Sequence, residues 1–212
     1  DRSVSRGLGD VYKRQGLYYP KRGEVLINDK PIEKYSIEEY RERTSVLFQD
    51  FLKYEGSLRE NIKLGDIRRD SSDDNINAAL NKANVDFLCQ EEKYSLDRIL
   101  GNWFDNGSQL SGGQWQKIAL ARVYYKEADI YLLDEPSSAL DATAELKIFN
   151  SFFEVSKGKI AIYITHRVKI AKNATKIIVI DEGKIVGIGN HAQLIESCSV
   201  YNELYKQEIK EY

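Results

Sequence analysis

The sequence predicts an α/β fold in which helices cover a mostly parallel sheet and a helical insert interrupts that sheet. Strand and helix patterns alternate in the second half of the chain, as they do in parallel sheets. Short apolar runs such as 160–164 and 177–180 have the length of buried strands. The block from about residue 50 to residue 122 gives mostly helical signals, which predicts the insert.

Composition indicates a folded domain of ordinary character. The chain has 212 residues, 42% hydrophobic and 30% charged, which is enough to bury a sizeable core. A net charge of −2 provides no basic field, so no nucleic-acid partner is expected. Cys89 and Cys198 lie far apart and match no metal or disulfide spacing. No apolar run approaches the about 20 residues of a membrane-spanning helix.

The strands are predicted from short apolar and β-branched runs that turn signals separate. In chain order these runs are 23–29, which predicts a strand followed by a turn, and then 44–49, 129–134 and 159–165. A hairpin follows, because two apolar runs between residues 177 and 189 flank the turn sequence EGK.

Helix starts are predicted where a serine precedes Glu or Gln by three residues, a capping box, at Ser36, Ser57 and Ser111. One face of a helix is indicated by the spacing of Ile76, Ala79, Leu80 and Ala83. Further helices are predicted at 142–156, with Asp141 as N-cap and Gly158 as stop, at 167–172, at 191–197 and from Tyr201.

Two carboxylates end a buried strand. Residues 130–133 are apolar, and Asp134 and Glu135 follow them directly. Ligands of open α/β sheets bind at the carboxyl ends of the strands. Asp134 is therefore a candidate to hold Mg²⁺, because hard cations prefer carboxylate oxygen, and Glu135 is a candidate to orient an attacking water. The alternative is a pair of carboxylates that only caps a turn before Pro136.

A glycine-rich helix start lies in the string LSGGQ. Ser111 and Gln114 form its capping box, and Gly112 and Gly113 occupy the first turn. Each glycine costs roughly 1 kcal/mol in helix propensity, so their presence favours a function. Glycines let an anion approach the N–H groups of a helix N-terminus. A phosphate site is predicted, with a flexible loop before a helix as the alternative.

Two more strands deliver polar groups to the same edge of the predicted sheet. His166 follows the strand at 159–165, and Gln49 ends the strand at 44–49. A lone histidine at a strand end is otherwise an ordinary surface or core residue. An amide, two carboxylates and an imidazole at one edge suit phosphoryl transfer, where catalysis is mostly positioning and electrostatics.

Together these motifs resemble the nucleotide-binding domain of ABC transporters over about residues 16–205. LSGGQ resembles the family signature, IYLLD at 130–134 the Walker B strand and SALD at 138–141 the D-loop. His166 resembles the switch histidine and Gln49 the Q-loop glutamine. The segments GSLRENI, FDNGSQLSGG and GIGNHAQLI are most similar to exporters with fused transmembrane domains.

The resemblance implies a P-loop NTPase (RecA-like) fold over residues 16–212, with a helical subdomain at about 50–122. It also implies a motor that binds and hydrolyses ATP, with Mg²⁺, to power transport across a membrane. Its partners would be a second nucleotide-binding domain and the transmembrane domains of an exporter. It would work at the cytoplasmic face of the cell membrane.

Residue roles follow from the same resemblance. Glu135 would be the catalytic base, with His166 at the terminal phosphate, and Asp134 and Gln49 would serve Mg²⁺. In a head-to-tail pair of domains, Asp141 would act across the dimer. The signature would cover the nucleotide of the partner domain through Ser111, Gly112, Gly113 and Gln114.

The chain departs from the family near its start. The phosphate loop G-x-x-x-x-G-K-[ST] does not occur in the sequence. Its lysine should fall near Gly7, and Lys13 does not follow a glycine-rich turn. Residues 1–15 are expected to be an unrelated or artefactual segment joined to a domain truncated at its N-terminus. Such a chain is expected to be inactive alone.

Two alternatives compete with the exporter motor, namely a soluble ABC ATPase of DNA repair or translation and a catalytically dead regulatory module. A soluble ABC ATPase of DNA repair would carry long coiled coils between the Q-loop and the signature, and the stretch from Gln49 to Leu110 leaves no room for them. A translation factor of the family would carry two such domains and basic linkers in one chain. A catalytically dead regulatory module is the remaining alternative.

Overall fold

The computed structural model describes residues 20, 22–89, 95–103, 107–136 and 142–210. The chain divides into two compact units, Asp1–Ile164 and Thr165–Tyr212. The elements of the first unit are β1 (Leu26–Ile27), β2 (Lys30–Pro31), the 3₁₀ helix η1 (Ile32–Lys34), α2 (Ile37–Glu42), β3 (Thr44–Leu47), β4 (Gly56–Ser57), α3 (Leu58–Lys63), α4 (Asp73–Lys82), α5 (Asp86–Cys89), β5 (Ile99–Leu100), α6 (Gly112–Tyr125), β6 (Ile130–Asp134), α7 (Ala142–Val155) and β7 (Ile160–Ile164). Those of the second are α8 (Val168–Ala171), β8 (Ile177–Asp181), β9 (Lys184–Gly189), α9 (His191–Ser197) and α10 (Ser199–Lys210).

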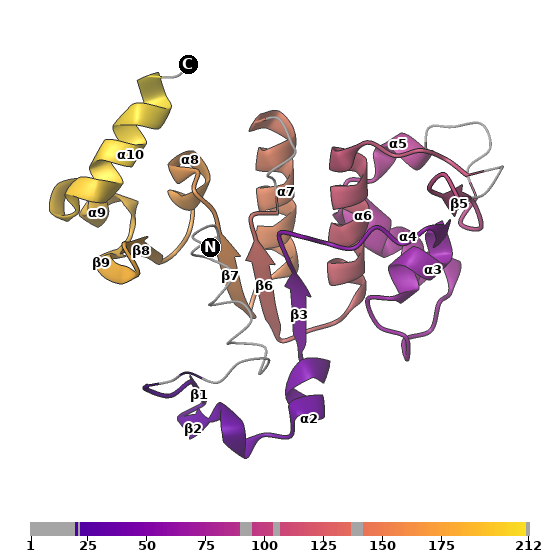
Figure 1. Ribbon diagram of the computed structural model, residues 1–212, viewed down its shortest axis with the longest axis horizontal. Coiled ribbons are helices and arrows are strands. Elements are labelled where there is room, and N and C mark those ends of the chain that lie inside the picture. Colours follow the sequence, from indigo (N-terminus) through magenta and orange to yellow (C-terminus); the bar gives the residue numbers. More distant parts are fainter. Residues whose placement is uncertain (1–19, 21, 90–94, 104–106, 137–141, 211–212) are drawn as a thin grey trace. The chain divides into compact units, whose positions relative to one another are not determined.

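A parallel three-stranded sheet in the order β3-β6-β7 carries the first unit (Figure 1). Thr44 pairs with Ile130, and Ile130 pairs with Ile160, so the three strands start and end nearly level. The central strand is apolar because both of its faces are covered, and Tyr131, Leu132 and Leu133 are all buried. The α/β fold and the parallel pairing predicted from the sequence are confirmed.

Helices α3, α4 and α6 pack together and share one hydrophobic core with β6 and α7. The four residues predicted to form one helix face, Ile76, Ala79, Leu80 and Ala83, are all buried in it. Helix α6 lies beside β3, where the Ser45 hydroxyl donates to the Val123 carbonyl at 3.0 Å. Because α6 leads directly into β6, it runs antiparallel to the strands, and its N-terminus lies at the end of the sheet where the strands finish (Figure 1).

One prediction about local structure was wrong in part. The capping boxes at Ser57 and Ser111 form completely. At Ser36 the hydroxyl accepts from the Glu39 N–H but donates to the Glu38 carboxylate, so only half of a capping box forms. The strand and turn predicted within 23–29 are present: the strand is the short β1, Leu26–Ile27, and Asn28 and Asp29 adopt positive φ and turn the chain back.

The second unit is a hairpin with helices packed against one of its faces. Strands β8 and β9 pair antiparallel, and the turn between them places Glu182 at φ 45° and Gly183 at φ 75°. Positive φ at both central residues matches the twist of a two-residue hairpin loop. The hairpin packs on α9 and α10 through the core Val168, Ile177, Val179, Leu194, Cys198 and Tyr201. Within the described parts of the chain, no helix is long and apolar enough to cross a membrane.

Candidate active site

The carboxyl end of β6 buries a carboxylate. Asp134 is the last residue of β6, pairs with Ile164 of β7 and is 2% exposed. Among the described residues its Oδ2 atom has no hydrogen-bond partner. Burial, and next the charge of Glu135, raise the pKa of Asp134 to about 6. A buried carboxylate oxygen without a proton donor is costly, so this end of the strand is suited to a cation.

The next residue, Glu135, turns back from the strand. Its φ is 44°, in the left-handed region that non-glycine residues seldom adopt, and its N–H donates to the Ile164 carbonyl at 3.0 Å. The carboxylate accepts a hydrogen bond from Gln49 Nε2 at 3.0 Å. Strained backbone of this kind clusters at functional sites, where the surrounding structure holds it.

Gln49 reaches this position because β3 and β6 are in register. Leu47 pairs with Leu133, so the residues that follow each strand emerge side by side at the same edge. The amide nitrogen of Gln49 is the atom that contacts Glu135. The three polar groups predicted for these two strand ends therefore lie together.

Helix α6 presents its N-terminus through a complete capping box. The Ser111 hydroxyl accepts from the Gln114 N–H at 3.2 Å, and the Gln114 side chain accepts from the Ser111 N–H at 2.8 Å. N–H groups in the first turn of a helix have no intrahelical acceptor, and Gly112 and Gly113 carry no side chains to shield theirs. The dipole of this 14-residue helix adds partial positive charge there. An anion can therefore bind at this helix start.

A groove of about 670 Å³ lies beside Gln49. Its walls come from α2, β3, the loop after β3, the end of α3 and α6, and include Phe48, Phe51, Leu52, Tyr54, Leu64 and Arg122. Leu52 is 64% exposed, Leu64 47% and Tyr54 41%. Apolar side chains gathered at an open groove are typical of a surface that contacts another protein.

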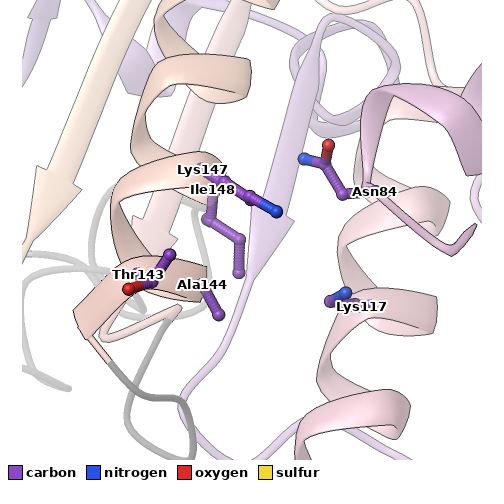
Figure 2. Close-up of a pocket in the computed structure, with 6 residues that line it drawn as sticks. All are labelled: Asn84, Lys117, Thr143, Ala144, Lys147 and Ile148. Carbon is purple, nitrogen blue, oxygen red and sulfur yellow. The ribbon is translucent and has the colours of Figure 1, made fainter. Parts of the chain in front are cut away.

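A smaller pocket of about 160 Å³ lies between α7 and α6, near the end of α4 (Figure 2). Figure 2 shows Lys147 of α7 and Asn84 extending towards each other across it, with Lys117 on α6. The described residues that line it include no carboxylate. It is therefore chemically unlike the end of β6 and does not offer a second metal site of that kind.

Comparison with known proteins places this arrangement in a family. A family model described as ABC transporter matches residues 15–138, more than half of the chain. The chain belongs to the ABC transporter family. Its α/β fold with a parallel sheet is that of the ATP-binding domain of an ABC transporter.

Relatives and a solved structure refine the comparison. The subtilin transport ATP-binding protein of Bacillus subtilis is 48% identical over 91% of this chain and 31% of its own length. The nisin transport ATP-binding protein of Lactococcus lactis is 47% identical over 91% of this chain and 32% of its own length. A bacterial Atm1-family ABC exporter, solved with ATP bound, matches 98% of this chain and 36% of its own at a TM-score of 0.87 and 26% identity. The chain spans about a third of the length of the curated relatives it matches.

The remaining predicted residues of this ABC domain are placed less closely. His166 is the second residue after β7 and belongs to the second unit, which is described by itself. Asp141 lies outside the described residues, with the rest of 137–141. The contacts of His166 and Asp141 with the site therefore stay predictions.

Sequence analysis missed residues next to the site. Arg122 and Asn61 donate hydrogen bonds to the Leu52 and Tyr54 carbonyls in the loop that follows Gln49, and neither residue was singled out. The signal for Arg122 was its place in the otherwise apolar run IALARVYY. A charged residue inside an apolar helix is seldom buried without partners, so the sequence could have predicted that Arg122 is held by hydrogen bonds.

Proposed function

We propose that the chain is the ATP-hydrolysing motor domain of an ABC exporter, and that Asp134, Glu135 and Gln49 form its reaction site. The observation that carries this proposal is the contact of Gln49 with Glu135 beside the buried Asp134. Phosphoryl transfer needs charge neutralisation and a positioned water rather than covalent chemistry by the protein. A buried aspartate and an adjacent glutamate held by an amide supply both.

The roles we propose combine the geometry of the strand ends with the resemblance to the ABC family. The Asp134 oxygen that has no hydrogen-bond partner among the described residues fits Mg²⁺, and the amide oxygen of Gln49 is a second candidate ligand. Among the described residues, no group of three or more His, Cys, Asp and Glu side chains could hold a metal ion by itself, so ATP phosphates and water would complete the coordination. When bound, the metal would neutralise phosphate charge. Glu135 would orient the attacking water and accept its proton, and His166 would contact the terminal phosphate.

The partners we propose are a second ATP-binding domain and the transmembrane domains of an exporter, at the cytoplasmic face of the membrane. The start of α6, with Ser111, Gly112, Gly113 and Gln114, would cover the nucleotide of the other domain, and Asp141 would act across the same dimer. The groove beside Gln49 is the surface we propose for the transmembrane domains. Its exposed apolar side chains Leu52, Tyr54 and Leu64 support this.

The class of substrate is suggested by the relatives. The two proteins at 47–48% identity are named for subtilin and nisin transport, whereas lipid A-core flippases are 32–34% identical. We propose a substrate of the subtilin or nisin kind.

The test places residues 16–212 in the subtilin transport ATP-binding protein of Bacillus subtilis, in place of the segment they match. We expect this chimera to hydrolyse ATP and to transport subtilin. Glu135→Gln should lower turnover by about 10²–10⁴-fold, because an amide cannot accept the proton. The Glu135→Gln chimera should still bind ATP. In the presence of ATP it should form a stable dimer that size-exclusion chromatography detects.

The matched control is Glu182→Gln, a glutamate that also has positive φ but lies in the β8–β9 turn. It should leave turnover unchanged. Turnover of the Glu135→Gln chimera at the unmodified rate would show that Glu135 is not the catalytic residue. The 212-residue polypeptide by itself, which contains no G-x-x-x-x-G-K-[ST] string, is expected to bind ATP weakly and to release no phosphate above an Asp134→Ala, Glu135→Gln control.

A further inference from the structure

Arg122 is a largely buried cation on α6 whose described hydrogen bonds all go to neutral oxygens. Its Nε donates to the Asn61 carbonyl at 3.0 Å, and its Nη2 donates to Asn61 Oδ1 at 2.6 Å. Its Nη1 donates to the Leu52 carbonyl at 2.6 Å. Burial lowers the pKa of Arg122 to about 10, so the guanidinium stays charged at neutral pH. Hydrogen bonds to a charged group are the stronger kind.

These contacts fasten the loop after β3 to α6. The Arg122 guanidinium lies 4.8 Å from the centroid of the Tyr54 ring, a cation–π distance. Asn61, which is 1% exposed, donates to the Tyr54 carbonyl at 2.9 Å and to the Ser57 carbonyl at 3.0 Å. The segment from Leu52 to Tyr54 is thus held by Arg122 directly and again through Asn61.

The fastened loop leads to the reaction site. Leu52 is three residues after Gln49, whose amide contacts Glu135. At its other end, α6 begins with the LSGGQ residues, and its backbone hydrogen bonds make it a rigid connection. Arg122 therefore connects α6, the helix that begins with the LSGGQ residues, to the loop that follows Gln49.

We propose that Arg122 is a positioning residue for ATP turnover. It holds the loop so that Gln49 stays in contact with Glu135, and it makes this contact depend on the position of the LSGGQ helix. The proposal adds to the proposed function and relies on it only for the kinetic readout. The planar guanidinium group is required, because its three donors reach Asn61 of α3 and Leu52 of the loop at the same time. A lysine ammonium cannot span both. Arg122 does not touch the nucleotide site itself, so its loss should affect the rate and spare nucleotide binding.

The first arm measures hydrogen exchange of the 212-residue chain with Arg122→Lys. Exchange of amides at residues 50–55 should rise about tenfold, because loss of the fork releases this loop locally. Exchange in α4 should stay unchanged. The matched control is Arg69→Lys, since Arg69 also binds α6, donating to the Tyr125 carbonyl at 2.5 Å and stacking on the Tyr125 ring, but from outside this loop.

The second arm measures ATP turnover of the subtilin-transporter chimera with the same substitutions. Arg122→Lys should lower kcat by about 10–10²-fold, as small misplacements of catalytic groups do, and leave KM within about twofold. Arg69→Lys should change neither constant. Tyr54→Leu removes the ring contact from the loop side and should shift exchange and kcat in the same direction, which keeps the proposal testable if Arg122→Lys does not fold.

Exchange that rises equally in α3, α4 and α6 would show that Arg122 only stabilises the fold, and would overturn the proposal. So would an unchanged kcat in a chimera whose loop 50–55 has become mobile. If the unmodified chimera does not hydrolyse ATP, the proposed function fails, and the exchange arm alone decides whether Arg122 holds the loop.

Discussion

At the scale of single residues, Asp134 makes stability depend on pH. Its pKa is raised to about 6 in the folded chain from an ordinary value near 3.8, so the folded state holds a proton that the unfolded state releases. The corresponding stability is fully present below about pH 4 and is lost as the pH rises through about 6. At neutral pH the buried charge therefore costs roughly 2–3 kcal/mol of the free energy of unfolding.

Asp134→Asn should remove this cost, because an amide is neutral at every pH. We expect the variant to be more stable than the parent chain by roughly 2–3 kcal/mol at pH 7 and equally stable near pH 4. Urea unfolding across this range measures the difference. The control is Asp129→Asn, because Asp129 is an exposed aspartate directly before the first residue of β6. A stability difference for Asp134→Asn that does not vary with pH would contradict the explanation.

At the scale of elements, the two complete capping boxes allow the stability that a cap provides to be distinguished from a role in ATP-dependent dimer formation. Ser57 and Ser111 each accept from the N–H three residues on, and the side chain of that residue reaches back. Ser57→Ala and Ser111→Ala should each lower stability by about 1 kcal/mol, because both remove a cap. Only Ser111→Ala should also weaken ATP-dependent dimer formation of the chimera, and Ser111→Arg should abolish it by blocking the helix start.

Thermal melts and size-exclusion chromatography with and without ATP measure the two effects separately. Equal loss of the dimer in the Ser57 and Ser111 variants would mean that the LSGGQ helix start contributes stability alone.

The elements were predictable where one local rule governs them. Apolar runs that end in polar residues located β3 and β6, and parallel pairing then brought Gln49 and Glu135 to one edge. The left-handed backbone of Glu135 and the hydrogen bond from Arg122 to the Leu52 carbonyl depend on contacts between distant segments. No local sequence pattern encodes such contacts. At Ser36 two neighbouring glutamates compete for one hydroxyl, and sequence spacing does not decide between them.

At the scale of the whole molecule, the two units have separate cores of very different size. The core of the second unit consists of Val168, Ile177, Val179, Leu194, Cys198 and Tyr201. The larger core of the first unit joins residues of helices α3, α4, α5, α6 and α7 with residues of strands β3, β5 and β6. A small core buries less apolar surface per ordered residue. The second unit is therefore expected to open at a lower free energy than the first.

Leu194→Ala tests whether the units respond separately. Leu194 is 0% exposed, and its loss should leave a cavity that costs about 2–5 kcal/mol. Hydrogen exchange should then rise in β8, β9 and α9 while the amides of β3 and β6 keep their protection. Leu80→Ala, at a position 1% exposed in α4, should do the reverse. Because each leucine belongs to one core only, an equal rise in both units after either substitution would show that the chain unfolds as one cooperative body.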